Sequence, residues 1–408
     1  MTPYSATRIA VTGWGSVTAL GSHTAATWTR LIDGEGARGP ITCFPVDGCR
    51  VTEGAEARLP SLPWLSPKPQ SRLSRASRLA LPAAREALAH AGLLDGDGRS
   101  RISRLEMSVS TTACGMELGE AFIKDVWKGS PQPKQAARVS RYQAQQQTTD
   151  ISRHFGFTGP TSIISNACAG GANALGHAAD LIRAGLADIV LAGGYDALCE
   201  LVFCGFDSLQ SLSPDLCRPF DLNRNGLMLG EGAGFLVLES EPHAIRRGAQ
   251  IRGVLAGYGH TTDTFHLTQP AADGGPLERA MQRALLQSGI TPHDIGYVNA
   301  HGTGTPFNDR AEASAFARFF GEHFSQTRLS STKAATGHTL GAAGSIEAIF
   351  CLMALQERRI PQQLHTQNPE PLVAGILAGP DAAMTKHATL SVNLGFGGSN
   401  GALIFTTP

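Results

Sequence analysis

The stretch SIISNACAGGANALGHAADLIRAGLADIVLAGGYD, residues Ser162–Asp196, decides the fold. It begins with a short isoleucine-containing run, passes through small residues into an alanine-rich helical pattern, and ends in a second apolar run. A strand, a helix and a second strand in this order form a βαβ unit, in which the strands are parallel and the helix covers one face of the sheet. The sequence therefore predicts an α/β protein built on buried parallel strands.

The same alternation of strands and helices continues on both sides of this stretch. Strands are expected at Arg8–Thr12, Glu106–Ser110, Ser162–Ser165, Ile189–Ala192, Gly234–Glu239, Ile251–Tyr258, Ile295–Asn299, Ala388–Asn393 and Gly401–Thr406. Helices are expected at Arg78–Ala91, Ala172–Ala184, Pro276–Ser288, Arg310–Phe320 and Gly344–Gln356.

The two halves of the chain show the same order of elements. A helical pattern precedes the strand Glu106–Ser110, and a similar one precedes Ile295–Asn299. We interpret this order as an internal duplication joined near Ser240–Gln250. The predicted halves are residues 1–245 and 246–408.

Two segments do not follow the alternation. Arg38–Gln70 is rich in proline and glycine and is expected to be irregular. Lys124–Tyr142 is basic and rich in turn residues, which is typical of a surface cap.

The composition limits the classes of protein. The chain has 408 residues, 42% hydrophobic and 17% charged, with 34 Lys+Arg against 34 Asp+Glu. This is enough apolar material for a large core, and the neutral total excludes nucleic-acid binding driven by bulk charge. The chain shows no signal-peptide pattern and no apolar run of about 20 residues, so we expect a cytoplasmic protein that does not span a membrane. The eight cysteines include no CxxC pair and no Cys/His set at zinc spacing, so no metal site is expected.

GWGSVT at Gly13–Thr18 is similar to a dinucleotide-binding turn. Thr18 stands where the third glycine of that motif belongs, and no acidic ribose ligand follows at the right place. We interpret the segment as a tight structural turn.

Cys168 is the candidate nucleophile. It lies between a predicted strand and a small-residue helix, where the free N–H groups and the positive end of the helix favour a thiolate. The same N–H groups could stabilise an oxyanion on an acylated cysteine. The pattern alone is equally compatible with an inert buried thiol.

Two histidines strengthen the interpretation of Cys168 as a catalytic residue. His301 begins HGTGTP directly after a predicted strand, and His338 lies in the loop STKAATGHTLGAAG before a helix. The ends of parallel strands are where open α/β sheets place reactive groups.

Together these motifs resemble the Cys-His-His set of β-ketoacyl-acyl carrier protein synthases. The resemblance rests on NACAGGANA, VNAHGTGTPFNDRAEA and SSTKAATGHTLGAAGSIEA, with GEGAGFLVLE, SVNLGFGGSN and AVTGWGSVTALG, and runs from about Arg8 to Phe405. It is greatest for the elongating synthase II type. It implies a thiolase-like fold in which two duplicated βαβ halves form α-β-α-β-α layers, and it implies a dimer.

The resemblance also implies roles for individual residues. Cys168 would accept the acyl chain, and His301 and His338 would bind the malonyl thioester and promote decarboxylation. Lys333 and Glu312 would form an ion pair behind the histidines.

Further residues would shape the substrate site. Thr303 and Thr305 would hydrogen-bond the phosphopantetheine arm of the carrier protein. Phe396, between Gly395 and Gly397, would gate the cysteine, and its backbone N–H would pair with that of Cys168 as an oxyanion hole.

The implied reaction is the decarboxylating Claisen condensation of an acyl chain with malonyl-acyl carrier protein, in fatty acid or type II polyketide or polyene elongation. It needs a thioester-forming nucleophile and N–H donors for the enolate oxygen. Loss of CO2 supplies the carbanion, so no metal, flavin or nicotinamide is implied.

Some positions depart from the family pattern. Cys114 stands where relatives often carry a bulkier aliphatic residue that limits chain length. In the family, the stretch at the dimer contact and the distal acyl pocket is commonly apolar. In this chain it is polar, because it contains Arg138 and Gln145–Gln147. Two copies of Arg138 facing each other across a two-fold axis would repel. A heterodimer or a non-fatty-acyl substrate would account for these departures. These two hypotheses together fit the sequence about as well as ordinary homodimeric fatty acid elongation does.

A set of basic residues could dock an acidic carrier protein. Its members are Lys68, Arg72, Arg75, Arg78, Lys124, Lys128 and Arg224.

Three alternative functions fit this pattern less well. A degradative thiolase would carry a second catalytic cysteine where this chain has GFGGSN, and a priming synthase would carry asparagine in place of His338. A non-catalytic subunit that only sets chain length would typically lack Cys168.

Overall fold

The computed structural model describes residues 7–130 and 133–408. The strands are β1 (Ile9–Thr18), β2 (Gly39–Pro40), β3 (Glu53–Gly54), β4 (Glu106–Ser110), β5 (Thr161–Ile164), β6 (Ile189–Asp196), β7 (Gly232–Ser240), β8 (Gly253–Thr262), β9 (Ile295–Asn299), β10 (Arg328–Ser330), β11 (Ala388–Gly395) and β12 (Ser399–Thr406). The helices are α1 (Thr24–Ile32), α2 (Pro67–Gln70), α3 (Arg75–His90), α4 (Met116–Trp127), α5 (Pro133–Val139), α6 (Ala144–Phe155), α7 (Gly170–Arg183), α8 (Glu200–Ser208), α9 (Glu241–Arg246), α10 (Gly275–Ser288), α11 (Pro306–Phe320), α12 (Lys333–Thr336) and α13 (Ala343–Glu357). Short 3-10 turns are η1 (Ala167–Ala169), η2 (Pro292–Asp294), η3 (Gly321–Gln326) and η4 (Leu340–Ala342).

The large sheet repeats one strand order. Its strands run β10-β9-β11-β12-β8-β1-β7-β6-β4-β5, so the order β1-β7-β6-β4-β5 in the first half matches β8-β12-β11-β9-β10 in the second. The directions match as well, because the first two pairings of each half are antiparallel and the last two are parallel. A short antiparallel pairing of β1 with β8 joins the halves. The division at residue 245 stays a prediction; it falls between the end of β7 and the start of β8.

The expectation of parallel strands throughout is wrong for the closing strands. β7 and β12 run antiparallel to both of their neighbours. In the second half the reason is local: only three residues, 396–398, separate β11 from β12, and a connection this short can only reverse the chain. The sheet is therefore mixed.

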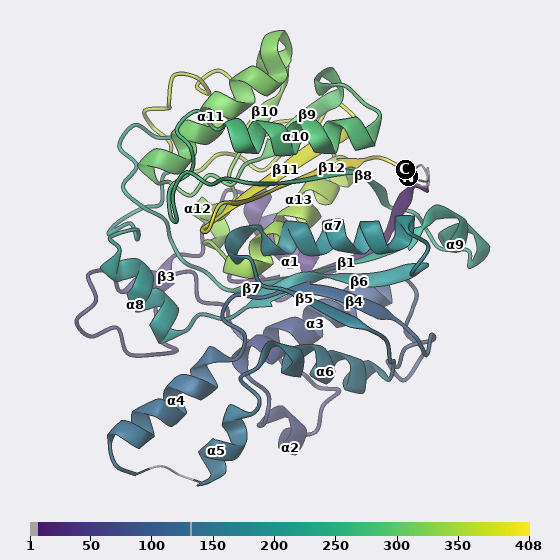
Figure 1. Cartoon of the computed structure of the whole chain (residues 1–408), viewed down its shortest axis with the longest axis vertical. Helices are drawn as coiled ribbons and strands as arrows, with labels where there is room; N and C mark the ends of the chain where they lie inside the picture. The colour runs from purple at the N-terminus through teal and green to yellow at the C-terminus, as the bar shows by residue number, and fades with distance from the viewer. Residues whose placement is uncertain (1–6, 131–132) are drawn as a thin grey trace.

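The layers follow the predicted α-β-α-β-α order. Helices α3 and α6 cover the outer face of the first half, α10 and α11 cover that of the second, and α7 and α13 lie between the halves (Figure 1).

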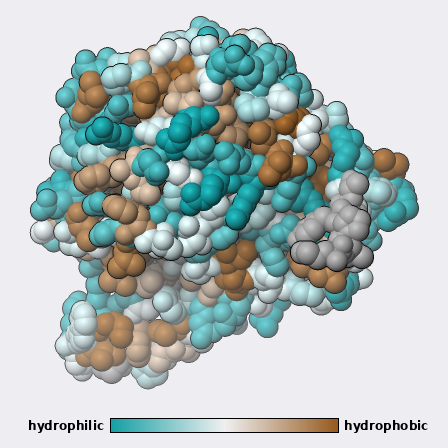
Figure 2. All heavy atoms as spheres, turned by 45° about the horizontal axis from the view of Figure 1, so that its top comes forward, coloured by the Kyte–Doolittle hydropathy of each residue, from teal (hydrophilic) through white to brown (hydrophobic). Residues whose placement is uncertain are grey.

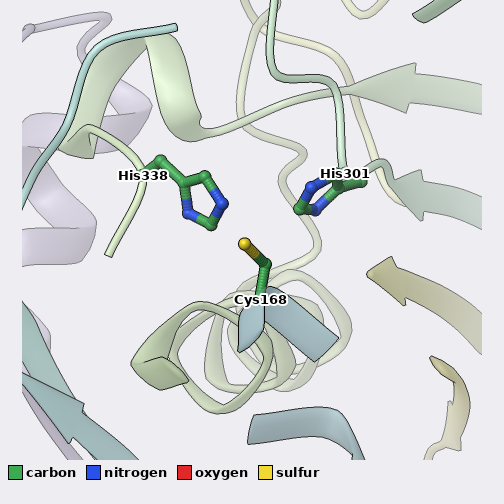
Figure 3. A group of neighbouring side chains, drawn as sticks. All are labelled: Cys168, His301 and His338. Carbon is green, nitrogen blue, oxygen red and sulfur yellow. The ribbon is translucent and has the colours of Figure 1, made fainter. Parts of the chain in front are cut away.

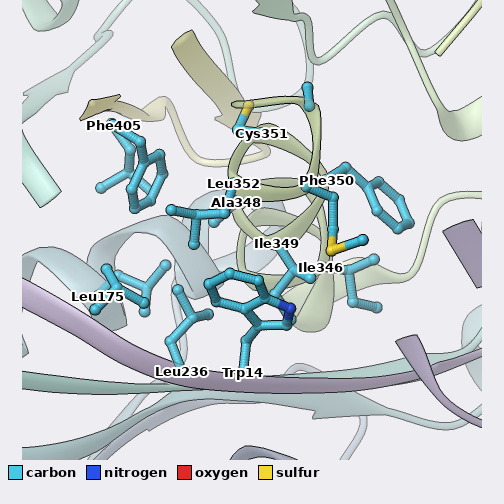
Figure 4. Close-up of a cluster of buried hydrophobic side chains, with 14 of the residues drawn as sticks. Trp14, Leu175, Leu236, Ile346, Ala348, Ile349, Phe350, Cys351, Leu352 and Phe405 are labelled. Atoms are coloured by element: carbon cyan, nitrogen blue, oxygen red, sulfur yellow. The ribbon is translucent and has the colours of Figure 1, made fainter. Parts of the chain in front are cut away.

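The central helix α13 is buried on every side. All its residues from Ala343 to Leu355 are buried, and its apolar side chains meet Trp14, Leu236 and Phe405 (Figure 4). Among the described residues, Leu340–Glu357 is long and apolar enough to cross a membrane, but 89% of it is buried inside the protein. A helix that lies between the two halves of the sheet needs apolar residues on all its faces.

The two irregular segments differ from each other. Residues 38–70 hold only β2, β3 and α2 besides irregular chain, as expected. Lys124–Tyr142, predicted to be turn-rich, instead contains the end of α4 and all of α5, which project as a helical lobe (Figure 1). Apolar side chains gather on this lobe (Figure 2), where Ile123 is 43%, Val126 40% and Trp127 82% exposed.

Candidate active site

Cys168 lies in the tight turn between β5 and α7. Ala167, just before it, has a φ of +56°, which is rare for a residue with a side chain and marks backbone strain at this point. The following glycines allow close packing, since a Cβ on Gly170 would lie 2.0 Å from Ser110 Oγ. Cys168 itself is only 6% exposed.

His301 follows β9 and is fixed through its backbone. The Glu312 carboxylate on α11 accepts hydrogen bonds from the N–H groups of His301, at 2.8 Å, and Gly302, at 2.6 Å. Asn308 donates to the same carboxylate at 2.7 Å. Burial, together with the charge of Asp309, raises the pKa of Glu312 to about 8.

His338 is fixed in one orientation and one tautomer. Its backbone N–H donates to Met228 O at 2.7 Å, and its carbonyl accepts from Gly230 N at 3.0 Å. Its ring Nδ1 accepts a hydrogen bond from Leu340 N at 3.2 Å. In the neutral ring the proton is therefore on Nε2. That buried Nε2, like Nδ1 of His301, has no hydrogen-bond partner among the described residues.

The three side chains converge from two halves of the chain. The Cys168 sulfur and one ring nitrogen from each of His301 and His338 all lie within 4.8 Å of one another. The two imidazole rings stand edge to face, with centroids 5.2 Å apart. The thiol points between the two rings (Figure 3). This Cys/His set could hold a metal ion, a possibility that sequence spacing did not indicate.

The three side chains line a cavity of about 260 Å³. The predicted residues Thr303, Thr305 and Phe396 line it as well. The hydroxyl oxygens of the two threonines lie 2.9 Å apart.

The site favours neutral forms of its titratable groups. Burial and the charge of Lys333 hold the pKa values of His301 and His338 well below 6.5, so both rings are neutral near pH 7. Burial raises the pKa of the Cys168 thiol to about 11, against the opposing effects of the Lys333 charge and the Phe396 N–H. Desolvation therefore opposes the thiolate that the sequence predicts from the helix end, and it makes the largest contribution to the shift in the pKa.

Lys333 pairs with Glu347, and the predicted ion pair with Glu312 is wrong. The Lys333 ammonium on α12 forms a buried ion pair with the Glu347 carboxylate on α13. Asn393 Nδ2 donates to the other oxygen of that carboxylate at 2.6 Å. Glu312 is instead occupied by backbone N–H groups. Glu347 was missed, although a lone carboxylate in an apolar helix needs a buried partner.

The GFGG turn closes over the nucleophile. The backbone N–H groups of Phe396 and of Cys168 itself lie close enough to the thiol to lower its pKa, against the effect of burial. A side chain at Gly395 would be tightly packed, because a Cβ there would lie 3.0 Å from Asn166 O and 3.3 Å from Cys168 N. The Phe396 ring is 37% exposed and stacks on Phe206 of α8, with centroids 5.6 Å apart. Gly397 N–H donates to Leu267 O at 2.7 Å.

Two predicted pocket residues lie away from the cavity. Cys114, half-buried after β4, is not among the residues that line it. Arg138 is exposed on the α5 lobe.

The basic set divides into free and paired side chains. Lys68, Arg72 and Lys128 are exposed. Lys124 pairs with Glu200. Arg78 is half-buried, and its Nε has no partner among the described residues.

Two members of the basic set cannot present a free charge. Arg75 is 16% exposed and binds Glu231 through Nε at 2.8 Å. Arg224 is 7% exposed and pairs with Glu370 at 3.2 Å. Their assignment to docking was therefore wrong, since both charges are neutralised inside the protein.

This geometry, a buried thiol facing two neutral imidazoles and two backbone N–H groups, defines a thioester-processing condensing enzyme. The comparisons agree with that class. The beta-ketoacyl synthase N-terminal domain matches residues 6–244, and its C-terminal domain matches residues 252–367. The chain belongs to the β-ketoacyl synthase family and is a ketosynthase-type condensing enzyme.

Relatives match nearly the whole length of the chain. Nodulation protein E of a Rhizobium species is 36% identical over 403 residues, covering 98% of both chains. The 3-oxoacyl-(acyl-carrier-protein) synthase 2 of Staphylococcus aureus is 34% identical over 407 residues, also covering 98% of both.

Solved structures of ketosynthases are similar as well. The ishigamide ketosynthase/chain length factor matches with a TM-score of 0.90 and 30% identity over 98% of this chain and 99% of that one. A type II polyketide synthase acyl-carrier protein in complex with its ketosynthase bound to the hexaketide gives 0.87 and 28%, over 98% and 99%.

The raised thiol pKa makes a testable prediction. Alkylation of Cys168 by iodoacetamide should speed up about tenfold per pH unit from pH 7 to 9.5, because the thiolate fraction rises that way below the pKa. Peptide mapping by mass spectrometry, with Cys168→Ala as control, measures the rate. An alkylation rate that stops rising below pH 8 would show that the helix end lowers the pKa of the thiol more than burial raises it.

The corrected ion pair makes a second prediction. Glu347→Gln should destabilise the protein by about 3–5 kcal/mol, because it leaves the Lys333 charge buried and unpaired. Chemical denaturation of a double-mutant cycle with Lys333→Met should give strong coupling to Glu347. The same cycle with Glu312→Gln is the control. Stronger coupling of Lys333 to Glu312 than to Glu347 would support the ion pair that the sequence predicts.

Proposed function

We propose that this chain catalyses the decarboxylating Claisen condensation of an acyl chain held on Cys168 with a malonyl unit on an acyl carrier protein. The observation that carries the proposal is the convergence of Cys168, His301 and His338 within 4.8 Å in one cavity. The N–H groups of Phe396 and Cys168 beside the thiol support it.

Acyl transfer comes first. Cys168 Sγ attacks the carbonyl of the incoming acyl thioester, and the N–H groups of Phe396 and Cys168 stabilise the oxyanion. The carbon–sulfur bond to the carrier breaks, and the thiol proton ends on the departing carrier sulfur. Because the pKa of Cys168 is raised to about 11, the thiol must lose its proton as it attacks.

Decarboxylation and condensation follow. The imidazole N–H groups of His338 and His301 bind the carbonyl oxygen of the malonyl thioester. The bond to the carboxylate breaks, CO2 leaves, and its electron pair forms an enolate whose oxygen those N–H groups stabilise. The enolate carbon attacks the acyl carbonyl on Cys168, and the sulfur leaves as thiolate, which takes a proton from water. The product is a β-ketoacyl thioester on the carrier.

Lys333 acts through its charge and does not contact the reacting atoms in this mechanism. That charge, with burial, keeps both histidines neutral and able to donate without a net charge. Glu312 and Glu347 are positioning residues for His301 and Lys333.

The substrates would arrive on phosphopantetheine, with Thr303 and Thr305 along the arm. The exposed Lys68, Arg72 and Lys128 would meet the acidic carrier. Decarboxylation supplies the carbanion, so the mechanism needs no metal or redox cofactor. We place the enzyme in the cytoplasm.

A heterodimer is the favoured assembly. β5 lies at the edge of the sheet with β4 as its neighbour, and the α4–α5 lobe exposes apolar side chains, so both surfaces suit a partner subunit. The solved relative with TM-score 0.90 is a ketosynthase/chain length factor. The exposed Arg138 on this lobe would repel its own copy, whereas a partner with a carboxylate there would not. The second hypothesis is that the distal part of the pocket is polar and accepts an acyl chain other than a fatty acyl chain.

The reaction is tested by separating its two half-steps. Cys168→Ala should abolish condensation, because no other residue holds the acyl chain, while decarboxylation of malonyl carrier protein survives. His301→Ala and His338→Ala should each slow decarboxylation about 100-fold or more and slow acylation of Cys168 less. Intact-mass labelling by an acyl-carrier donor follows acylation, and CO2 release follows decarboxylation. Full elongation by Cys168→Ala would refute the assignment of Cys168 as nucleophile, whereas no acyl label on Cys168 of the wild type would favour the structural-subunit alternative.

The assembly is tested by native mass spectrometry. The chain expressed alone should give a monomer or an inactive dimer, and co-expression with a chain-length-factor-like protein from a neighbouring gene should give an active heterodimer. Arg138→Glu should weaken that heterodimer, with Arg153→Glu as a surface control. A homodimer that elongates saturated chains at full rate would overturn both the heterodimer and the non-fatty-acyl hypotheses.

A further inference from the structure

Two thiols from distant parts of the sequence meet beside the active-site wall. Cys49 lies in the irregular segment 38–70, and Cys204 lies on α8, with their sulfur atoms 3.5 Å apart. Both side chains are half-buried and both are free thiols. Neither residue takes part in the proposed mechanism.

The backbones that carry the two thiols are tied together. Asp207, one turn after Cys204, accepts hydrogen bonds from Arg50 N at 2.7 Å and Val51 N at 3.1 Å. The Arg50 guanidinium donates to Leu212 O at 2.7 Å. The residues that follow Cys49 are therefore held against α8, and the two sulfurs stay opposite each other.

Helix α8 also carries part of the cavity wall. Phe206, two residues after Cys204, lines the cavity and stacks on Phe396 with ring centroids 5.6 Å apart and planes 24° apart. Leu209 and Gln210, just past the helix end, line the same cavity. A restraint on α8 thus acts on the aromatic pair in front of Cys168.

We propose that Cys49 and Cys204 form a reversible disulfide that holds α8 in place and slows acyl loading of the site. The part on acyl loading rests on the proposed function; the disulfide itself does not. To form the bond, the two sulfurs need to approach from 3.5 Å to about 2.05 Å.

The oxidant is a small disulfide such as oxidised glutathione. One protein thiol, as thiolate, attacks it and forms a mixed disulfide while one reduced glutathione leaves. The second protein thiol then attacks the mixed disulfide and releases the second glutathione. Two thiols are oxidised, one small disulfide is reduced to two thiols, and no other reactant is needed. Burial and the adjacent Cys49 raise the pKa of Cys204 to about 11, so the bond forms slowly at neutral pH.

The bond is tested by mass spectrometry on the full chain. After incubation with oxidised glutathione, the intact mass should fall by about 2 Da and a peptide map should join Cys49 to Cys204. Cys49→Ser and Cys204→Ser should each lose this link. Cys43→Ser is the matched control, because Cys43 is a half-buried thiol of the same segment, and it should keep the link. Absence of the link under these conditions, or a stable glutathione adduct on either thiol, would overturn the proposal.

The effect on the site is tested by acylation kinetics. Oxidised wild type should acylate Cys168 about fivefold or more slowly than reduced wild type, dithiothreitol should restore the rate, and Cys49→Ser should be insensitive. An equal loss of acylation rate on oxidation of Cys49→Ser would show that oxidation acts on Cys168 itself, and it would overturn the proposed restraint of α8. No acylation of the reduced wild type would instead count against the proposed function.

Discussion

The active site depends on a backbone contact between the first turns of α7 and α13. A Cβ on Gly171 would lie 2.7 Å from Ser345 N, and one on Gly344 would lie 2.4 Å from Ala172 N. The two helices therefore approach more closely than side chains allow. Because Cys168 immediately precedes α7 and His338 lies a few residues before α13, this contact places the thiol and the imidazole together. The third residue, His301, comes from the end of β9 in the same half as His338.

Much of the fold and of the site could be predicted from the sequence. The strands Glu106–Ser110 and Ile295–Asn299 occur as expected, since short β-branched runs between helical patterns have few other interpretations. The helices α4, α6 and α8 were not predicted, because partly exposed helices carry weaker apolar patterns. The antiparallel direction of β7 escaped prediction for another reason: buried strands look alike whichever way they run.

The sequence motif that contains Lys333 does not reveal which carboxylate the lysine pairs with. Glu312 and Glu347 are both buried carboxylates near the lysine, and each needs compensation for loss of water. Glu312 receives it from backbone N–H groups at the start of a loop, which no sequence spacing reveals. The lysine charge is then left for Glu347. Likewise, the protonation state of Cys168 follows from how completely the thiol is enclosed, a property of the assembled layers.

The repeated strand order has a consequence for the origin of the chain. Each half alone would leave the inner face of its central helix, α7 or α13, in contact with water, because in the structure that face is covered by the other half. A half-length ancestor would therefore have needed a second copy of itself to be stable. If the chain arose by fusion of two such copies, the copies would no longer have had to stay identical. One copy would then have been free to keep a nucleophile at the start of its helix while the other acquired histidines at the matching edge, so that a symmetric pair would become an asymmetric catalyst.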